Sequence, residues 1–339
     1  MRNQLYFIGV GFLLFSCASQ KTVQKTVSKP TVVAKPVEKK EDVAPQKPPV
    51  QHQGIYDFYK VNIGNVAKND NTISHGSIVS AQPVGYKVTK NYFPAVAQNF
   101  RQRYIIVHYT ALDNEKSLRV LTQQSVSSHY LVNDYNDDEI YQLVDENKRA
   151  YHAGVSSWRG IQNLNDTSIG IEIVNTGYTA DAKGVKTFYE FPEWQFKKVA
   201  ALIKDLAQRY DIPATGILAH SDIAPTRKED PGPKFPWKRL YDEYNVGMWY
   251  DDATKMKYLN AIFPEQHLAE LNTYGFITRY QTLLGQLGYG ITINGMPDKS
   301  TLKTVEAFQY HFRPEKCDGV MDAETWAILQ ALVEKYPSK

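Results

Sequence analysis

Three side chains of the kinds that bind transition metals lie at or after the ends of apolar segments. His108 lies near the end of residues 103–109, and His220 ends residues 216–220. Asp230 follows ten residues after His220. Two imidazoles and one carboxylate can fill three positions of a tetrahedral Zn²⁺ site and leave the fourth for water, which is the arrangement of catalytic zinc. Because His and Asp are common, the spacing alone leaves open that these are ordinary core or surface residues.

Two further charged residues have a place in such chemistry. Glu172 stands at the centre of the alternating segment 168–174, where a carboxylate is costly to bury without a partner. It is therefore either half of a buried salt bridge or a catalytic base. Lys228 lies two residues before Asp230, and a cation beside a metal site would stabilise a developing oxyanion.

The elements that must position these residues follow from the apolar pattern. Residues 193–210 carry apolar side chains at spacings of three and four, which predicts an amphipathic helix that begins after Pro192. Short β-rich segments predict strands, of which the second and third form a hairpin: 103–109, 129–132, 140–144, 168–174 and 216–220. The simplest architecture is an α/β domain, a mixed sheet flanked by helices.

Composition limits the class of protein. The 339 residues suggest about two domains of roughly 150 residues. An apolar fraction of 42% excludes a wholly disordered chain, and two cysteines are too few for a disulfide scaffold. The net charge of +3 has no basic block behind it, so no nucleic-acid partner is expected. The strongly apolar window is confined to the N-terminus, which argues against a protein with several membrane spans.

Five segments in order resemble one known family. They are Ile-Val-His-Tyr-Thr at 106–110, Ser-Ser-His-Tyr-Leu at 127–131, Tyr-His-Ala-Gly-Val-Ser-Ser-Trp at 151–158, Asn-Asp-Thr-Ser-Ile-Gly-Ile-Glu at 165–172, and the long segment 219–237. Together they look like the zinc-dependent N-acetylmuramoyl-L-alanine amidases of the AmpD/AmiD type, relatives of phage amidases and animal peptidoglycan recognition proteins. The resemblance covers about residues 86–246.

The resemblance implies a site and a reaction. It implies one Zn²⁺ on His108, His220 and Asp230, with Glu172 as general base and Lys228 as oxyanion stabiliser. The reaction implied is hydrolysis of the amide between the lactyl group of N-acetylmuramic acid and L-alanine of the stem peptide. Tyr151 replaces a Trp that is frequent in the family, a mild departure that preserves stacking.

Other residues of these motifs are candidates for substrate binding. His152 resembles a family position beside the cleft, where it either touches substrate or packs. Trp158 and Arg159 could stack on or pair with the sugar-peptide, and the alternative is an ordinary surface pair. His129 is expected to make hydrogen bonds in the core. The other four histidines have no motif around them and are expected to be structural or solvated: His52, His75, His267 and His311.

The C-terminal region, residues 250–339, has a different character. Helical spacing at 277–287, 299–312 and 322–335 predicts a small three-helix domain, with Asp322 as an N-cap. The sequence of residues 307–326 resembles that of a peptidoglycan-binding helical domain. The alternative is a bundle that only supports the catalytic domain. Cys317 has no partner for a disulfide within the chain and is expected to be a partly buried small residue.

The N-terminal residues are interpreted as a targeting signal followed by a tether. Residues 1–17 resemble a lipoprotein signal peptide whose Ser16-Cys17 pair makes Cys17 the lipidation site; an ordinary signal peptide is the alternative. Residues 18–53 read as a tether because residues 21–50 hold seven Lys and five Pro. Residues 54–85 are either tether or an early part of the fold.

The leading interpretation is a lipid-anchored peptidoglycan amidase of cell-wall turnover and recycling. The alternative from another class is a non-catalytic peptidoglycan-binding lipoprotein. A zinc carboxypeptidase would use the same chemistry on the terminal D-alanine. Ala18 after the lipidated cysteine is compatible with sorting to the outer membrane, so we expect an outer-membrane lipoprotein facing the periplasm. We also expect a monomer.

Overall fold

The structure is a computed structural model, and it describes residues 50–53, 56–59, 83–86 and 99–338. The chain divides into units 1–47 and 48–339. Cys17 and most of the predicted tether therefore lie outside the described residues. The last four residues of the predicted tether form β1 (Val50–Gln53), which pairs antiparallel with β2 (Tyr56–Tyr59), and the bounds of the tether stay a prediction. The Lys- and Pro-rich composition of residues 21–50 gave no indication of the short strand that starts at Val50.

A five-stranded mixed sheet forms the centre of the N-terminal domain, as predicted. Its order is β11-β3-β8-β4-β5, in which the first four strands are parallel and β5 runs antiparallel to β4. The strands are β3 (Tyr104–Tyr109), β4 (Tyr130–Val132), β5 (Tyr141–Gln142), β8 (Ser168–Ile173) and β11 (Ile217–Ala219). The side chains of Ile105, Ile106 and Val107 are fully buried, so β3 is covered on both faces.

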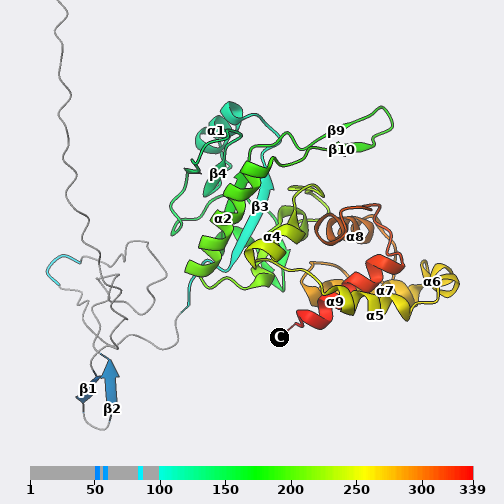
Figure 1. Cartoon of the computed structure of the whole chain (residues 1–339). Helices are drawn as coiled ribbons and strands as arrows, with labels where there is room; N and C mark the ends of the chain where they lie inside the picture. The colour runs from blue at the N-terminus through cyan, green and yellow to red at the C-terminus, as the bar shows by residue number, and fades with distance from the viewer. Residues whose placement is uncertain (1–49, 54–55, 60–82, 87–98, 339) are drawn as a thin grey trace, which may run out of the picture. The chain divides into compact units, whose positions relative to one another are not determined.

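Helix α2 (Glu193–Arg209) lies against the sheet (Figure 1). It buries one stripe of apolar side chains on the sheet, and each such side chain contributes about 1.5–3 kcal/mol when fully buried. These are Phe196, Val199, Ala200, Ile203 and Leu206. The predicted helix over 193–210 is confirmed. Two 3-10 turns, Leu164–Asp166 and Ala214–Gly216, precede β8 and β11.

Several short elements of this domain were not expected from the sequence. Helix α1 begins where the Asp113 side chain accepts a hydrogen bond from the Lys116 backbone N–H. Two hairpins interrupt the regions between sheet strands, and the β9–β10 hairpin extends from the domain in Figure 1. The elements are α1 (Asn114–Gln123), β6 (Ser157–Trp158), β7 (Ile161–Gln162), β9 (Tyr178–Ala180), β10 (Lys186–Phe188), α3 (His220–Ile223) and α4 (Trp237–Tyr244).

The C-terminal domain is all helical, and the predicted fold class is confirmed. The three predicted helices are present, and Asp322 accepts from the Thr325 backbone N–H as expected of an N-cap. Two shorter helices precede them, one of which has no buried residue and therefore gave no amphipathic signal. The five helices are α5 (Asp252–Asn260), α6 (Pro264–Glu270), α7 (Tyr274–Leu287), α8 (Lys299–Phe312) and α9 (Ala323–Lys335).

Two turns of the C-terminal domain are built alike around a buried glutamine. The Gln281 side chain lies across the turn before α8 and accepts from the Gly295 backbone N–H at 2.8 Å. The Gln309 side chain lies across the turn before α9 and accepts from the Gly319 backbone N–H, also at 2.8 Å. Both glycines have positive φ angles, of 67° and 72°. The domain thus contains an internal repeat that the sequence reading missed.

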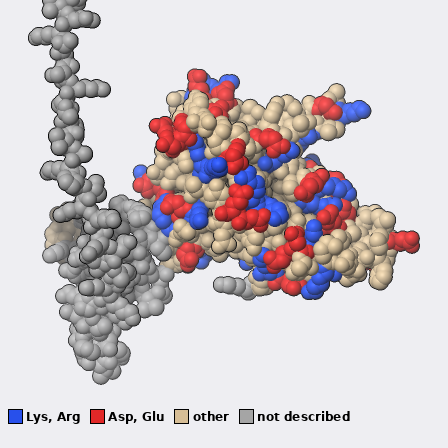
Figure 2. All heavy atoms as spheres, in the orientation of Figure 1, with Lys and Arg blue, Asp and Glu red and all other residues tan. Residues whose placement is uncertain are grey.

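The two domains share one continuous hydrophobic core, which includes Trp158 and Trp237 from the first domain and Tyr289 and Phe308 from the second. Figure 2 shows acidic and basic side chains interspersed on the face in view. Within the described residues, no helix combines the length and the apolar character needed to span a bilayer.

Candidate metal centre and active site

The parallel strands bring the candidate residues to one edge of the sheet. His108 and Glu172 are direct register partners near the carboxyl ends of β3 and β8. His220 directly follows β11, which pairs with β3 on its other side. Because parallel strands end at the same edge, residues separated by up to 112 positions in sequence meet there. The loop after α3 then returns with Lys228 and Asp230.

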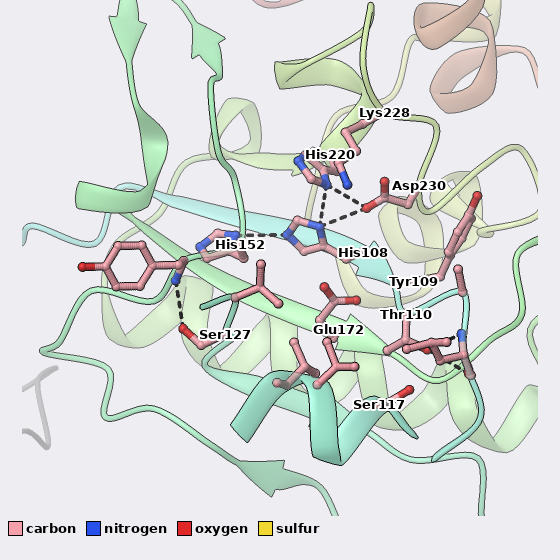
Figure 3. Close-up of a pocket in the computed structure, with 16 residues that line it drawn as sticks. His108, Tyr109, Thr110, Ser117, Ser127, His152, Glu172, His220, Lys228 and Asp230 are labelled. Carbon is pink, nitrogen blue, oxygen red and sulfur yellow. Dashed lines mark hydrogen bonds and ion pairs between the residues drawn. The ribbon is translucent and has the colours of Figure 1, made fainter. Parts of the chain in front are cut away.

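Three ligand atoms converge on one point (Figure 3). The Nδ1 atoms of His108 and His220 are 2.8 Å apart. Asp230 Oδ2 lies 3.0 Å from the first and 2.9 Å from the second. All three residues are buried. The structure therefore brings together the three predicted metal ligands.

The hydrogen bond made by His220 Nε2, which faces away from the other two ligand atoms, determines whether its Nδ1 atom carries a hydrogen. His220 Nε2 lies 3.2 Å from the carbonyl oxygen of Ala153, a geometry in which the imidazole donates. A neutral imidazole with its hydrogen on Nε2 has a bare lone pair on Nδ1. A hydrogen bond from the outer nitrogen to a backbone carbonyl is the usual way in which a metal-binding histidine is oriented.

A chain of hydrogen bonds fixes His108 in the same way. Ser168 Oγ donates to the Leu164 carbonyl oxygen at 2.5 Å, so its oxygen accepts from His152 Nε2 at 3.1 Å. His152 Nδ1 then accepts from His108 Nε2 at 3.0 Å. The Nδ1 atom of His108 is left bare. Burial, with the neighbouring His108, lowers the pKa of His152 well below its usual value, so His152 is neutral as this chain requires.

The donor set fits a divalent cation. Two imidazole nitrogens and a carboxylate oxygen face one another at hydrogen-bond distances, and the contacts of the two Nε2 atoms favour the tautomers in which both Nδ1 lone pairs are free. Burial and the neighbouring His220 lower the pKa of His108 to about 4, so it is neutral at pH 7. Burial acts to raise the pKa of Asp230, but His220 and His108 outweigh it and hold that pKa well below the usual range. Neutral imidazoles with an ionised carboxylate are the ligands that Zn²⁺ prefers.

Glu172 is the unpaired acid of the site. Its Oε2 atom is buried and has no hydrogen-bond partner, and Glu172 forms no ion pair with the described residues. Burial, with the charge of Asp230, raises its pKa to about 8, and Lys228 acts in the opposite direction. The salt-bridge alternative is therefore not what the structure shows. A carboxyl group with this pKa can both accept and release a proton near neutral pH.

These residues line a pocket of about 250 Å³. Lys228 lies beside His220 in Figure 3 and also lines the pocket. The opposite wall is largely apolar and comes from α1 and its neighbours: Leu112, Val120, Leu121 and Val126. Sequence reasoning missed this wall. The signal was present, since Asp113 is an N-cap residue followed by apolar side chains at 118 and 121.

The predicted substrate contact of Trp158 needs correction. Its side chain is fully buried, its indole N–H donates to the Thr215 carbonyl oxygen, and its ring packs on Tyr289 of the C-terminal domain. A Cβ at Gly288 would lie 2.6 Å from the Trp158 ring. A ring enclosed in this way cannot stack on a sugar.

Arg159 is also directed away from the pocket. With Gly160 it forms the two-residue turn between β6 and β7, and both have positive φ. Its guanidinium donates to the carbonyl oxygens of Leu287 and Tyr336. The structure therefore gives Arg159 a role in the contact between the domains rather than at the substrate.

His152 and His129 support the site through hydrogen bonds. His152 lines the pocket, so substrate contact stays a prediction, but its two nitrogens are engaged with His108 and Ser168. His129 Nδ1 accepts from the Gly170 backbone N–H and its Nε2 lies 3.0 Å from the Lys148 carbonyl oxygen, which confirms its core hydrogen-bonding role. Gly170 is required here because a Cβ would lie 2.5 Å from the His152 ring.

Asn165, the first residue of the 165–172 motif, supports the site through its side chain, a role that the sequence did not predict. Its Oδ1 accepts from the backbone N–H groups of His152 and Ala153 at 3.1 and 2.8 Å. It thereby fixes the backbone of His152, whose imidazole contacts His108, and of Ala153, whose carbonyl oxygen contacts His220. A mixed sheet with this donor set at one edge, beside a glutamate that has no hydrogen-bond partner, indicates the class of hydrolases.

Comparisons with known proteins agree with this class. The family model described as N-acetylmuramoyl-L-alanine amidase matches residues 98–233, and that of a putative peptidoglycan binding domain matches residues 273–329. These ranges lie inside the predicted domains, whose ends stay predictions. N-acetylmuramoyl-L-alanine amidase AmiD of Escherichia coli K12 is 42% identical over 241 residues, covering 70% of this chain and 84% of that protein. The chain belongs to the N-acetylmuramoyl-L-alanine amidase family.

Solved structures cover a larger share of this chain. A complex of E. coli AmiD with the substrate anhydro-N-acetylmuramic acid-L-Ala-D-gamma-Glu-L-Lys has a TM-score of 0.67 and 41% identity, covering 76% of this chain and 98% of that one. AmpDh3 of Pseudomonas aeruginosa with anhydromuramic pentapeptide has a TM-score of 0.62 and 39% identity, covering 77% and 100%. The predicted activity is confirmed: this chain is an enzyme that hydrolyses the amide between N-acetylmuramic acid and L-alanine in peptidoglycan.

Proposed function

We propose that the enzyme is a zinc amidase in which His108, His220 and Asp230 hold one Zn²⁺, Glu172 is the general base and acid, and Lys228 stabilises the oxyanion. One observation supports this most strongly. Two imidazole nitrogens and a carboxylate oxygen converge near Glu172, whose buried Oε2 atom has no hydrogen-bond partner. When bound, Zn²⁺ supplies Lewis acidity that polarises the substrate carbonyl and lowers the pKa of water.

The residues of the chain then move the protons. Glu172 accepts a proton from the attacking water as the new C–O bond forms at the lactyl carbonyl. It returns that proton to the nitrogen of L-alanine as the C–N bond breaks, so the peptide leaves as a neutral amine and the sugar as a carboxylic acid, which then loses its remaining proton to water. Lys228 lies where its ammonium can offset the negative charge that develops on the carbonyl oxygen.

The substrates of the relatives suggest the size of the substrate. The E. coli and P. aeruginosa structures hold muramyl peptides of three or more amino acids. We infer that this chain accepts muropeptides of the same kind, with the stem peptide along the apolar wall from α1. The C-terminal domain supports binding to peptidoglycan through its family match.

We further propose that the enzyme is a monomeric outer-membrane lipoprotein that faces the periplasm. The support is the sequence alone: the apolar run before Ser16-Cys17, Ala18 after it, and the Lys- and Pro-rich residues that follow. Thirty to forty residues of such chain reach roughly 35 Å, which would let an anchored enzyme work on the wall. Radiolabelled palmitate incorporation that is lost in Cys17→Ala would support the anchor, and equal labelling of both would contradict it.

Mass spectrometry of a defined muropeptide tests the activity and the metal together. Protein lacking residues 1–17 is incubated with zinc or with chelator. We expect release of an intact peptide that begins at L-alanine, with zinc and not with chelator. Equal release in the presence of chelator would overturn the zinc proposal. Loss of terminal D-alanine alone would indicate a carboxypeptidase.

A further inference from the structure

A buried carboxylate joins the metal-binding edge to the C-terminal domain. Asp222 is fully buried and lies two residues after His220 on α3. Its Oδ1 accepts from the Tyr289 hydroxyl at 2.6 Å, and its Oδ2 lies 2.7 Å from His311 Nδ1. Both partners belong to the C-terminal domain. Asp222 is no part of the metal-ligand set and has no place in the proposed proton transfers.

The partner imidazole is enclosed by aromatic rings. His311 stacks on Trp237 with ring centroids 4.0 Å apart and an interplanar angle of 22°, and on Phe312 at the same distance. Its Nε2 has no hydrogen-bond partner among the described residues. Its polar contact is therefore with Asp222. An apolar ring would fill the same space without burying an unpaired nitrogen, so packing alone does not account for a histidine here.

The Asp222 carboxylate is tied in turn to the backbone around His220. Its Oδ2 also accepts from the backbone N–H of Ala219, the residue before His220, at 2.8 Å. On the other side, the Ser221 backbone N–H donates to the Asp230 carbonyl oxygen at 3.0 Å. Helix α3 has only four residues, too few to be stable or oriented by itself. Its orientation depends on these side-chain contacts.

We propose that Tyr289 and His311 are positioning residues of the amidase: by holding Asp222 they orient α3 and thereby the His220 imidazole. The C-terminal domain then has a second role beyond binding peptidoglycan, since it completes the support of the metal site. The inference rests on the proposed function in one respect, that zinc is the metal held by His220.

A matched pair of Tyr→Phe variants of the full chain tests the proposal. Tyr289→Phe removes the hydroxyl that contacts Asp222 and keeps the ring. Tyr310→Phe makes the same change at a buried tyrosine next to His311, whose hydroxyl donates to Glu306 instead. Zinc affinity is measured by competition with a chromophoric chelator. We expect Tyr289→Phe to bind zinc about tenfold more weakly, as for loss of other outer hydrogen bonds at metal sites, and Tyr310→Phe to bind as the unmodified protein does.

A second pair separates positioning from packing. His311→Asn keeps a side-chain N–H donor near the position of Nδ1, whereas His311→Leu keeps apolar volume and removes the donor. We expect the Asn variant to retain more zinc affinity and kcat than the Leu variant, with KM unchanged in both. Thermal unfolding identifies any variant that fails to fold, and the other pair then decides.

The outcomes are distinguishable. Zinc binding by the unmodified protein, with equal affinities in Tyr289→Phe and Tyr310→Phe and no advantage of Asn over Leu at 311, would overturn the positioning role. Absence of zinc binding by the unmodified protein would instead overturn the proposed metal. Weakened zinc binding confined to Tyr289→Phe and His311→Leu is the expected result.

Discussion

Two partly buried glutamates of the same domain have opposite surroundings. Glu172 has a carboxylate oxygen with no partner, and burial raises its pKa to about 8. Glu146 accepts two hydrogen bonds of 2.7 Å from the Arg209 guanidinium and further bonds from Tyr130 and Tyr210. Burial acts to raise the pKa of Glu146 as well, but these donors lower it to about 2.

The difference teaches how to tell a working carboxylate from a structural one. Every hydrogen-bond donor around Glu146 stabilises its ionised form, which makes it a poor proton acceptor and a strong tie between strand and helix. The site at Glu172 omits those donors, so the group keeps its affinity for protons at a cost in stability. The following predictions test this contrast, from the largest effect to the smallest.

Glu172→Gln should lower turnover of a muropeptide by about 10²–10⁴-fold, because the general base is lost while the shape is kept. Zinc content and the free energy of unfolding should not decrease, since no hydrogen bond of the described residues depends on the missing charge. Product release by mass spectrometry and metal analysis check both points. A zinc-replete variant with full turnover would remove Glu172 from this role.

Glu146→Gln should do the reverse. It removes the carboxylate that pairs with both terminal nitrogens of the partly buried Arg209 guanidinium and leaves only Asp205 as its ionised partner, and we expect about 3 kcal/mol of lost unfolding free energy. The kcat of the folded fraction should be unchanged because Glu146 does not line the pocket. Urea denaturation and steady-state kinetics measure the two. A stable variant with low kcat would contradict the distinction.

The two carboxylates should also give opposite pH dependences of stability. The pKa of Glu172 is raised from 4.5 to about 8, so in metal-free protein its contribution to stability falls as pH rises through this window, at most by roughly 1.4 kcal/mol per pH unit. The pKa of Glu146 is lowered to about 2, so its contribution is present above pH 4.5 and is lost as pH falls toward 2. Unfolding curves of Glu172→Gln and unmodified protein should therefore converge at low pH, and parallel curves would refute the assignment.

The histidines of the site show the same contrast between tied and free atoms. The Nε2 atoms of His108 and His220 make hydrogen bonds that leave their Nδ1 lone pairs free. The hydrogen-bond chain that begins at His108 Nε2 passes through His152 and ends at Ser168. Ser168→Ala removes the acceptor for His152 and should weaken zinc binding by about tenfold. Chelator competition measures this, with Ser127→Ala as a control that contacts the Tyr151 backbone. Equal affinities would show that the tautomer of His108 is set elsewhere.

Glu193→Gln should have the smallest effect. Glu193 pairs with Arg239 on the surface, and water solvates both groups in the folded and unfolded states. The same chemical change as at Glu146 should therefore leave the unfolding free energy nearly unaltered. A loss comparable to that of Glu146→Gln would mean that burial does not decide the outcome.

The parts of the molecule that were predictable have strong local signals. The strands around His108 and Glu172 are continuous β-rich segments, and α2 has a clear apolar stripe, so their positions follow from periodicity. The candidate ligand set was recognisable because the ends of parallel strands meet and because the motif around Asp230 is long. These signals do not depend on how the two domains pack.

The parts that were missed depend on that packing. Trp158 reads as a rim aromatic until the C-terminal domain encloses it, and His311 has no motif because its partner Asp222 is 89 positions away. Helix α5 has no buried residue, so its sequence carries no period to detect. Pairings over such distances leave no trace in a window of ten or twenty residues.

One residue without a side chain illustrates a wider consequence. Gly170 lets the His152 ring lie directly over the backbone of β8, and its N–H is the donor to His129. Any larger residue would displace the ring that orients His108. In a scan of all substitutions selected for growth on wall fragments, position 170 would rank with the proposed metal ligands, although it offers no functional group. Low tolerance to substitution in this enzyme thus identifies positions where a side chain would not fit as well as positions that carry a functional group.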